Sequence, residues 1–390
     1  MKKTHLISFL GKVIGGGEYR YANYQIDTKH YRHRFFGLAL AEHHQPDQMV
    51  ILGTSGSMWD VLIESQATDN QWEVERIALI EAAQQNQVTQ AQLDELEPYI
   101  SEQIGIPTQL QLIPYGMNEA DQMAIVQSIA QHIQAGDHAI MDLTHGLRHL
   151  PMLGMFAAIY LQGAKNVTID GIYTGALDMT DSHTGITPVL NLTGLLSISR
   201  WTAALNVYDH SGDYATFSPL IQNAHTSQAL NKASFLERTN NTEQAKQQLA
   251  SIDKQLNDEL QQHPMSSLFA DALFSRLTWY KAPSRGEREI RLASNYLAQE
   301  DYLRAAIMGF EGYITLQLEK AKENPHDFQS RKALSDEHAA EDDRLKTLRA
   351  IRNALAHGLR PTHPKIIKIM AEQRTLHETL AQLFQGLLRK

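Results

Sequence analysis

The sequence predicts an α/β domain followed by an all-α domain. Short apolar runs alternate with helical patterns over the first half of the chain, and this alternation is typical of a parallel sheet covered by helices. From about Leu192 the strand pattern stops, and Gln, Glu, Lys and Arg become frequent. A chain of 390 residues is also long for a single core. We therefore predict a Rossmann-like sheet domain over residues 1–192 and a helical domain over residues 193–390.

The first-half elements follow from their patterns. The apolar runs lack a two-residue period, which is expected of strands that are buried on both faces. We predict strands at residues 5–11, 48–57, 108–116, 138–146 and 167–175. We predict helices at residues 32–44, 57–66, 118–133 and 150–163, with further helical pattern between 72 and 103.

The second half is predicted to be helical from Trp201 to Lys390. Four stretches that are rich in Pro, Gly, Ser or Asp interrupt it, at residues 209–219, 261–267, 281–287 and 322–330. For residues 342–361, "DDRLKTLRAIRNALAHGLRP", we predict a helix that ends at Gly358 in a left-handed cap, with Pro361 beyond it.

Composition narrows the function classes. Hydrophobic residues make up 43% and charged residues 20% of the chain, as in globular proteins. The absence of cysteine excludes disulfides, thiolate metal sites and cysteine nucleophiles. A net charge of −9 argues against broad binding to nucleic acid, so such contact should be local to a basic cleft. Without an apolar run of about 20 residues, and with "MKKTHLISFLG" interpreted as a first strand, we expect a cytoplasmic protein without a membrane partner.

The predicted strands end in small, polar or cationic loops. The loops are "GKVIGGGEYRY" after residue 10, "GTSGSMW" after 52, "YGMN" after 114 and "DLTHGLR" after 141. Ligands of open parallel sheets bind outside these carboxyl ends, and helix N-termini after Ser57 and Gly146 would offer N–H groups to an anion. Lys12, Arg20 and Arg148 could add positive charge. Together the loops favour an anionic, nucleotide-like ligand.

Simpler interpretations of these loops remain. Each loop could be an ordinary strand-to-helix turn in which Thr54 or Thr144 caps a helix. The glycines match neither the Walker loop nor the G-x-G-x-x-G dinucleotide pattern. His145 and His149 share a helical spacing, but no third metal ligand lies nearby in sequence. We therefore predict hydrogen-bonding or capping histidines and no metal site.

The stretch "RNALAH" carries a second hypothesis. Arg352, Asn353 and His357 lie near the end of the helix, where cations also satisfy carbonyls and complement the helix dipole. The functional alternative is RNA cleavage without a metal, since RNA brings its own nucleophile, the 2′-hydroxyl. His357 would transfer protons, Arg352 would stabilise the phosphate charge, and Asn353 would orient a partner. One such set makes a sparse active site. A homodimer that packs the two helices together would supply two sets in one cleft.

Both stretches resemble one family. "DLTHG" at residues 142–146 is similar to the D-x-T-H-G signature of CARF domains, and "RNALAH" fits the R-x4-6-H signature of HEPN ribonucleases. Their order resembles the CRISPR-associated CARF–HEPN ribonucleases of the Csx1/Csx2/Csm6 group, ancillary proteins of type III systems. "GTSGSMWD" and "SFLG" look like further ligand loops of this group.

The resemblance implies an allosteric endoribonuclease of antiviral defence. Paired CARF domains of a homodimer would bind one cyclic oligoadenylate, cA4 or cA6, and no other cofactor. The HEPN domains would then cut single-stranded RNA without a metal and leave a 2′,3′-cyclic phosphate. Carried onto this chain, the catalytic set is Arg352, Asn353 and His357. The ligand contacts are Leu10, Gly11, Lys12, Gly53, Thr54, Ser55, Gly56, Ser57, Asp142, Thr144, His145, Gly146 and Arg148.

Two other functions compete with this one. A non-catalytic regulator would use its sensor domain to control a helical interaction domain, and loss of Arg352 or His357 would have favoured it. An unrelated Rossmann-like enzyme acting on a free nucleotide, with a helical dimerisation domain, would call for a cofactor fingerprint or a catalytic acid/base pair in the first half. We find neither. Tyr19, Arg20 and Tyr21 either contact adenines or lie on the surface of a lid. Glu311 could lie near the catalytic pair, but a lone acid on a helix is more often solvated or paired, so we leave it out of the catalytic set.

Overall fold

The computed structural model describes residues 2–12, 19–66, 72–358, 361 and 363–388. The chain divides into two units, Met1–Leu196 and Ser197–Lys390. The division lies four residues beyond the predicted boundary, at the first turn of helix α7 (Leu196–Ser211). Each unit has its own hydrophobic core, so each is described by itself.

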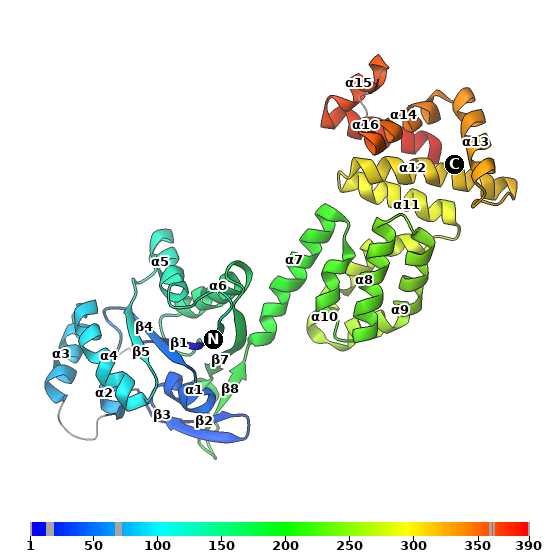
Figure 1. Ribbon diagram of the computed structural model, residues 1–390. Coiled ribbons are helices and arrows are strands. Elements are labelled where there is room, and N and C mark those ends of the chain that lie inside the picture. Colours follow the sequence, from blue (N-terminus) through cyan, green and yellow to red (C-terminus); the bar gives the residue numbers. More distant parts are fainter. Residues whose placement is uncertain (1, 13–18, 67–71, 359–360, 362, 389–390) are drawn as a thin grey trace. The chain divides into compact units, whose positions relative to one another are not determined.

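The first unit is built on a sheet whose centre is parallel, as predicted (Figure 1). Strand β1 pairs in parallel with β4 on one side and with β6 on the other, and β5 and β7 extend the two sides in the same sense. The strands of this centre are β1 (Thr4–Leu10), β4 (Gln48–Gly53), β5 (Thr108–Leu112), β6 (His138–Asp142) and β7 (Thr168–Gly175). In their order, β5-β4-β1-β6-β7, the chain adds β4 and β5 on one side of β1 and then β6 and β7 on the other. The switch between the two sides lies at β1 and β6, and it positions the site.

Helices cover both faces of the sheet. One core cluster joins β1 residues such as Leu6 to α1–α4, and another joins Ile7 and Phe9 of β1 to α5 and α6. Neighbouring side chains of β1 are therefore both buried, which explains why its sequence does not alternate. The helices are α1 (Phe36–His44), α2 (Asp60–Gln66), α3 (Glu73–Gln84), α4 (Gln90–Ile104), α5 (Glu119–Ala130) and α6 (His149–Ala164).

The sheet contains strands that the sequence analysis did not predict. They are β2 (Ala22–Ile26), β3 (Lys29–His33) and β8 (Ile186–Asn191), and among the described residues they complete an eight-stranded mixed sheet, β3-β2-β8-β7-β6-β1-β4-β5. β2 and β3 form an antiparallel hairpin that turns at Asp27 (φ 53°), and β8 runs antiparallel to β7. The helix predicted from residue 32 was therefore placed too early, because residues 29–33 pair in β3 and the helix begins at Phe36. Burial alternates along β2, so its two-residue period was the missed signal.

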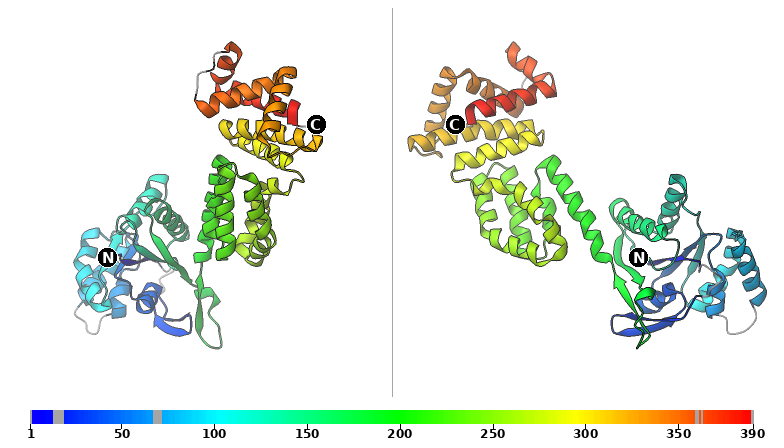
Figure 2. Two further views of the ribbon diagram at one scale, coloured as in Figure 1. Left: turned by 45° about the vertical axis from the view of Figure 1, so that its right-hand side comes forward. Right: turned by 180° about the vertical axis from the view of Figure 1, so that it is seen from behind.

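The second unit is helical, as predicted (Figure 2). Its helices after α7 are α8 (Ala224–Arg238), α9 (Thr242–Gln262), α10 (Pro264–Arg276), α11 (Arg285–Ala298), α12 (Tyr302–Ala321), α13 (Phe328–Glu341), α14 (Asp343–His357), α15 (Pro364–Met370) and α16 (Gln373–Leu388). The second unit also contains the 3-10 turns η3 (Tyr214–Leu220) and η4 (Thr278–Lys281), whereas η1 (Leu177–Met179) and η2 (Thr193–Leu195) belong to the first unit. Each of the four predicted interruptions contains a break between α-helices, but part of each belongs to a flanking helix. At residues 261–267 only His263 lies between α9 and α10, because Pro264 begins α10 as its first residue. None of the helices in the described part of the chain combines the length and the apolar character that a membrane span requires.

Candidate functional sites

The first site lies where β1 and β6 end side by side. The chain continues from β1 to β4 on one side of this pair and from β6 to β7 on the other, and ligands of open parallel sheets bind at such a switch point. The loops touch at two glycines: a Cβ atom on Gly11 would lie 2.6 Å from the backbone nitrogen of Gly146. Gly146 itself has φ 105°, a conformation that other residues rarely adopt. The predicted glycines therefore allow a close approach of two strand exits.

Asp142 lies beneath this loop. Its carboxylate is fully buried and accepts hydrogen bonds from the Ser8 hydroxyl (2.5 Å) and the Thr144 N–H (2.9 Å). The Thr144 hydroxyl in turn accepts the N–H of Gly175 (2.8 Å), which ties the loop to β7. Burial raises the pKa of Asp142 to about 6, although the Ser8 and Thr144 bonds oppose the shift. The buried Asp142 carboxylate therefore stabilises the start of the loop through its hydrogen bonds with Ser8 and Thr144.

His145 is held as a neutral ring. Its Nε2 accepts the N–H of Phe36 (3.3 Å), and its ring lies edge-on to Tyr19, 4.9 Å between centroids. Burial lowers the pKa of His145 to about 4, so at neutral pH it offers hydrogen bonds and no charge. His149 Nε2 donates to the carbonyl of Tyr115 (2.7 Å). His145 thus contacts Phe36 at the start of α1, whereas His149 contacts the loop after β5. Among the described residues, no three His, Cys, Asp or Glu side chains form a group that could hold a metal ion.

A cavity of about 620 Å³ opens at this point. Five of the predicted ligand residues line it: Gly11, Lys12, Thr144, His145 and Gly146. The wall also contains Tyr19, Arg20, Tyr21, Ala22, Arg34, Leu177, Asp178, Thr180, Gly185 and Thr187. Residues 13–18, part of the predicted glycine-rich loop, lie outside the described residues.

The cavity wall is predominantly cationic. Lys12, Arg20 and Arg34 face one acid, Asp178, among the described lining residues. Arg34 also pairs with Glu64 (2.7 Å), and its guanidinium lies 4.8 Å from the ring of Tyr21. An excess of positive charge in a concave site favours an anionic ligand.

The aromatic residues near Lys12 have different roles. The Tyr19 hydroxyl accepts the N–H of Gly11 (2.8 Å), and burial raises its pKa above the ordinary value. Tyr21 is half exposed, and arginines 32 and 34 both approach its ring. Tyr19 therefore supports the loop, whereas Tyr21 remains accessible at the rim.

The loop after β4 lies beside the cavity without lining it. The Ser57 hydroxyl donates to the carbonyl of Leu10 (2.9 Å) and accepts the N–H of Thr54 (2.9 Å), so both residues are buried in the loop. Gly53 packs on Trp59, Gly56 packs on Asn86, and the half-buried Ser55 donates weakly to Tyr115 (3.4 Å). Leu10 belongs to the core, and Arg148 is exposed at the start of α6. Ligand contacts by these residues stay predictions.

The two predicted anion-binding helix ends differ. The N-terminus of α2 carries Asp60 in its first turn, and this buried acid occupies the place of an anion. The N-terminus of α6 has no acidic residue in its first turn and no side-chain cap. The Leu150 N–H already donates to the Leu147 carbonyl (2.8 Å) and Pro151 has no N–H, so among the first three residues of α6 only His149 has an N–H for an anion.

Several lining residues were missed by sequence analysis. Arg34 lies between β3 and α1, and Thr187 lies within β8, both far in sequence from the loop at Asp142. Asp178 and Thr180 lie on the segment that joins β7 to β8. No local pattern marks these residues, because the unpredicted strands bring them to the cavity.

The second site lies at the end of α14. Arg352 Nη1 donates to Asn353 Oδ1 (2.8 Å), and its Nη2 donates to Glu311 Oε1 (2.8 Å) on α12. The guanidinium lies 4.8 Å from the centre of the Phe310 ring. His357 is exposed at the last position of the helix, and Gly358 follows with φ 61°, which confirms the predicted left-handed cap. Of the two alternatives for Glu311, the structure shows a paired acid that contacts Arg352.

Comparison with known proteins identifies the first unit. Residues 5–178 match the family model of the CARF domain of the CRISPR system endoribonuclease Csx1. The first unit is a CARF domain. The chain therefore contains a CARF domain, and both sequence matches are to CRISPR-associated proteins.

Two relatives extend the comparison. A CRISPR-associated protein of Methanocaldococcus jannaschii is 22% identical over 239 residues, which cover 56% of this chain and 38% of the relative. The match therefore spans well under half of that relative's length. The solved structure of Enterococcus italicus Csm6 bound to cyclic hexa-2′-fluoro-hexa-dAMP is 10% identical, with coverage of 99% of this chain and 94% of that one. Its TM-score is 0.38, and we base no argument on this likeness.

Proposed function

We propose that this protein is an endoribonuclease that is activated by cyclic oligoadenylate and acts in type III CRISPR defence. The observation that carries the proposal is the combination, in one chain, of a CARF domain with Arg352, Asn353 and His357 at the end of one helix. The sensor would bind cA4 or cA6, and the helical HEPN domain would cut single-stranded RNA.

The CARF cavity supports an oligonucleotide activator. Cationic side chains, Lys12 and Arg20 among them, suit phosphates, while Thr144 and the neutral His145 suit hydroxyls and base edges. The N-terminus of α6 adds the N–H of His149 directly after the loop, since the Leu150 N–H is bonded to Leu147 and Pro151 has none. A ring that carries phosphates and adenines could use all three features.

The α14 site supports cleavage by the RNA's own hydroxyl. The 2′ oxygen attacks phosphorus, the bond to the 5′ oxygen breaks, and a 2′,3′-cyclic phosphate forms. One proton leaves the 2′ hydroxyl and one joins the departing 5′ oxygen. His357 is accessible for one of these transfers, and Arg352 would stabilise the phosphate with N–H groups that Asn353 and Glu311 leave unused.

The CARF unit also supports a homodimer. Met152, Phe156 and Tyr160 lie four residues apart on α6 and are 62%, 60% and 47% exposed. An exposed apolar stripe of this kind is typical of a protein interface. A second copy seated on α6 would bring two loops at residues 142–148 near one another, as a two-fold symmetric ring requires.

The deciding experiment is a cleavage assay on labelled single-stranded RNA with EDTA present. The full chain receives no activator, cA4 or cA6 in parallel, and binding of each ring is measured separately. We expect cleavage with one ring, products that end in a 2′,3′-cyclic phosphate, and a loss of at least about 100-fold in His357→Ala. Ring binding should be the same in His357→Ala, because that residue belongs to the other unit.

The alternatives give other results. Ring binding without cleavage under any condition would favour the non-catalytic regulator. Full activity in His357→Ala would contradict the catalytic assignment, and neither binding nor cleavage would contradict the proposal as a whole.

A further inference from the structure

Arg352 is held in place by contacts that come from outside its own helix. One edge of its guanidinium donates to Glu311 Oε1 (2.8 Å), and its face lies over Phe310, both of which belong to α12. A guanidinium has five N–H donors in one plane, so two hydrogen bonds and one ring contact fix its orientation and leave three donors.

The other oxygen of Glu311 is taken by a second arginine. Arg331 of α13 donates through Nη2 to Glu311 Oε2 (2.6 Å). Glu311 therefore bridges Arg331 and Arg352 with one oxygen each. The three groups carry one net positive charge, so the bridge positions Arg352 without cancelling the charge that a phosphate would meet.

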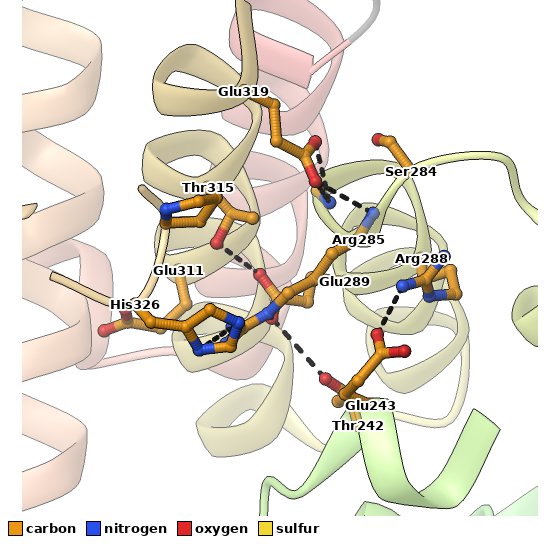
Figure 3. Close-up of polar contacts among 12 residues, drawn as sticks. Thr242, Glu243, Ser284, Arg285, Arg288, Glu289, Glu311, Thr315, Glu319 and His326 are labelled. Atoms are coloured by element: carbon orange, nitrogen blue, oxygen red, sulfur yellow. Dashed lines mark hydrogen bonds and ion pairs between the residues drawn. The ribbon is translucent and has the colours of Figure 1, made fainter. Parts of the chain in front are cut away.

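Arg331 is itself anchored in the interior. Its Nη1 donates to the hydroxyl of Thr315 (3.1 Å) and to the carbonyl of Pro325 (2.8 Å). The buried Thr315 hydroxyl donates to Glu289 Oε2 (2.7 Å), as Figure 3 shows. Glu289 also accepts from Arg285 Nε (2.8 Å).

The backbone of α12 is fixed as firmly as these side chains. A Cβ atom on Gly286 of α11 would lie 2.7 Å from the backbone of Leu316, and one on Gly312 would lie 3.0 Å from the nitrogen of Ile290. Helices α11 and α12 therefore pack at close range, and α12 cannot rotate easily. Glu311, which is next to Gly312, is directed toward Arg352 by this packing.

We propose that Glu311 is a positioning residue for Arg352, and that Arg331 keeps Glu311 in place. The inference rests on the proposed ribonuclease function. Glu311 touches no reacting atom and acts through the orientation of the Arg352 guanidinium. Without it, Arg352 would keep its charge but lose one of its two hydrogen bonds, and misplacement by about 1 Å can cost about 100-fold in rate.

The test measures cleavage by the full chain with saturating activator. Glu311→Gln keeps the shape of the side chain but can no longer bridge two cations. We expect kcat to fall by roughly 10- to 100-fold, with KM changed by less than about threefold. In an Arg352→Lys background, where the guanidinium fork is absent, the same substitution should add little.

Glu319→Gln is the matched control. Glu319 lies on the same helix and accepts N–H groups of Arg285 and Gly286, so it shares the environment of Glu311 but not its contact with Arg352. We expect Glu319→Gln to retain the wild-type kcat.

The outcomes separate the two proposals. If the wild-type chain cleaves RNA and Glu311→Gln has an unchanged or higher kcat, the positioning role is wrong and the ribonuclease function stands. Equal losses in Glu319→Gln, or additive losses in the Arg352→Lys background, would also overturn it. If the wild-type chain cleaves nothing with any ring, both proposals fail together.

Discussion

At the scale of single residues, Asp142 and His145 show how one loop buries two titratable groups. Both lie within four residues of chain, and burial pushes the pKa of Asp142 up to about 6 and that of His145 down to about 4. Each shift disfavours the charged form. At neutral pH the histidine is therefore neutral, while the carboxylate relies on Ser8 and the Thr144 N–H.

The two shifts act in opposite directions on stability. Between pH 4 and 6, folded Asp142 binds more protons than the unfolded chain, so its contribution to the free energy of unfolding is lost as the pH rises through 6. Between pH 4 and 6.5, His145 is protonated in the unfolded chain but not in the folded one, so its contribution is present above pH 6.5 and is lost as the pH falls to 4. Each effect is on the order of 3 kcal/mol, and the two largely cancel.

Single substitutions should reveal this compensation. Asp142→Asn should make the CARF unit gain stability relative to wild type as the pH rises from 4 to 7, whereas His145→Gln should make it lose stability over the same range. Hydrogen exchange of amides in β1 and β6 of the full chain, measured across this range, gives the local free energies. Parallel pH profiles for both variants and the wild type would contradict the assigned pKa directions.

At the scale of elements, the site depends on two strand exits that meet. β1 and β6 pair in parallel from Thr4 to Ser8, and their continuing loops touch at Gly11 and Gly146. The neighbouring atom at Gly11 is backbone, which cannot turn aside as a side chain would. Glycine at this position is therefore required by the fold as well as by any ligand.

Gly11→Ala should therefore destabilise the CARF unit by about 1–3 kcal/mol. Gly163→Ala is the control, because Gly163 lies in α6 with open space at its Cβ position. That substitution should be neutral or stabilise by up to about 1 kcal/mol. Thermal unfolding of both variants checks the pair, and a Gly11→Ala variant as stable as Gly163→Ala would show that the loops separate at little cost.

At the scale of the whole molecule, the chain forms two units with separate hydrophobic cores. The clusters of the CARF unit contain residues from Leu6 to Leu196, whereas the helical core runs from Trp201 to Leu388. The two compact units divide between these ranges. Each unit should therefore have its own free energy of unfolding.

Calorimetry of the full chain should resolve two unfolding transitions. Leu380→Ala removes a fully buried side chain from α16 and should lower only the transition of the helical unit, by about 2–5 kcal/mol in free energy. Leu6→Ala in β1 should lower only the other transition by a similar amount. A single transition that both variants shift equally would show that the units unfold together.

The sequence by itself determined the features that depend on local pattern. Apolar runs without alternation predicted the parallel strands, because strands buried on both faces need no polar side. Gly358 and Pro361 predicted the end of α14, since a left-handed cap favours glycine. The "DLTHG" loop indicated the CARF domain because its residues are contiguous in the sequence and so form a recognisable local motif.

Only the tertiary structure decided which distant residues meet. Asp142 lies 134 residues from Ser8, and Arg352 lies 41 from Glu311, so no periodicity joins either pair. Arg34 and Thr187 reach the cavity because β3 and β8 join the sheet. The sequence analysis did not predict β8 as a strand. Local pattern encodes turns and buried faces, whereas contacts across long separations arise from how those faces pack.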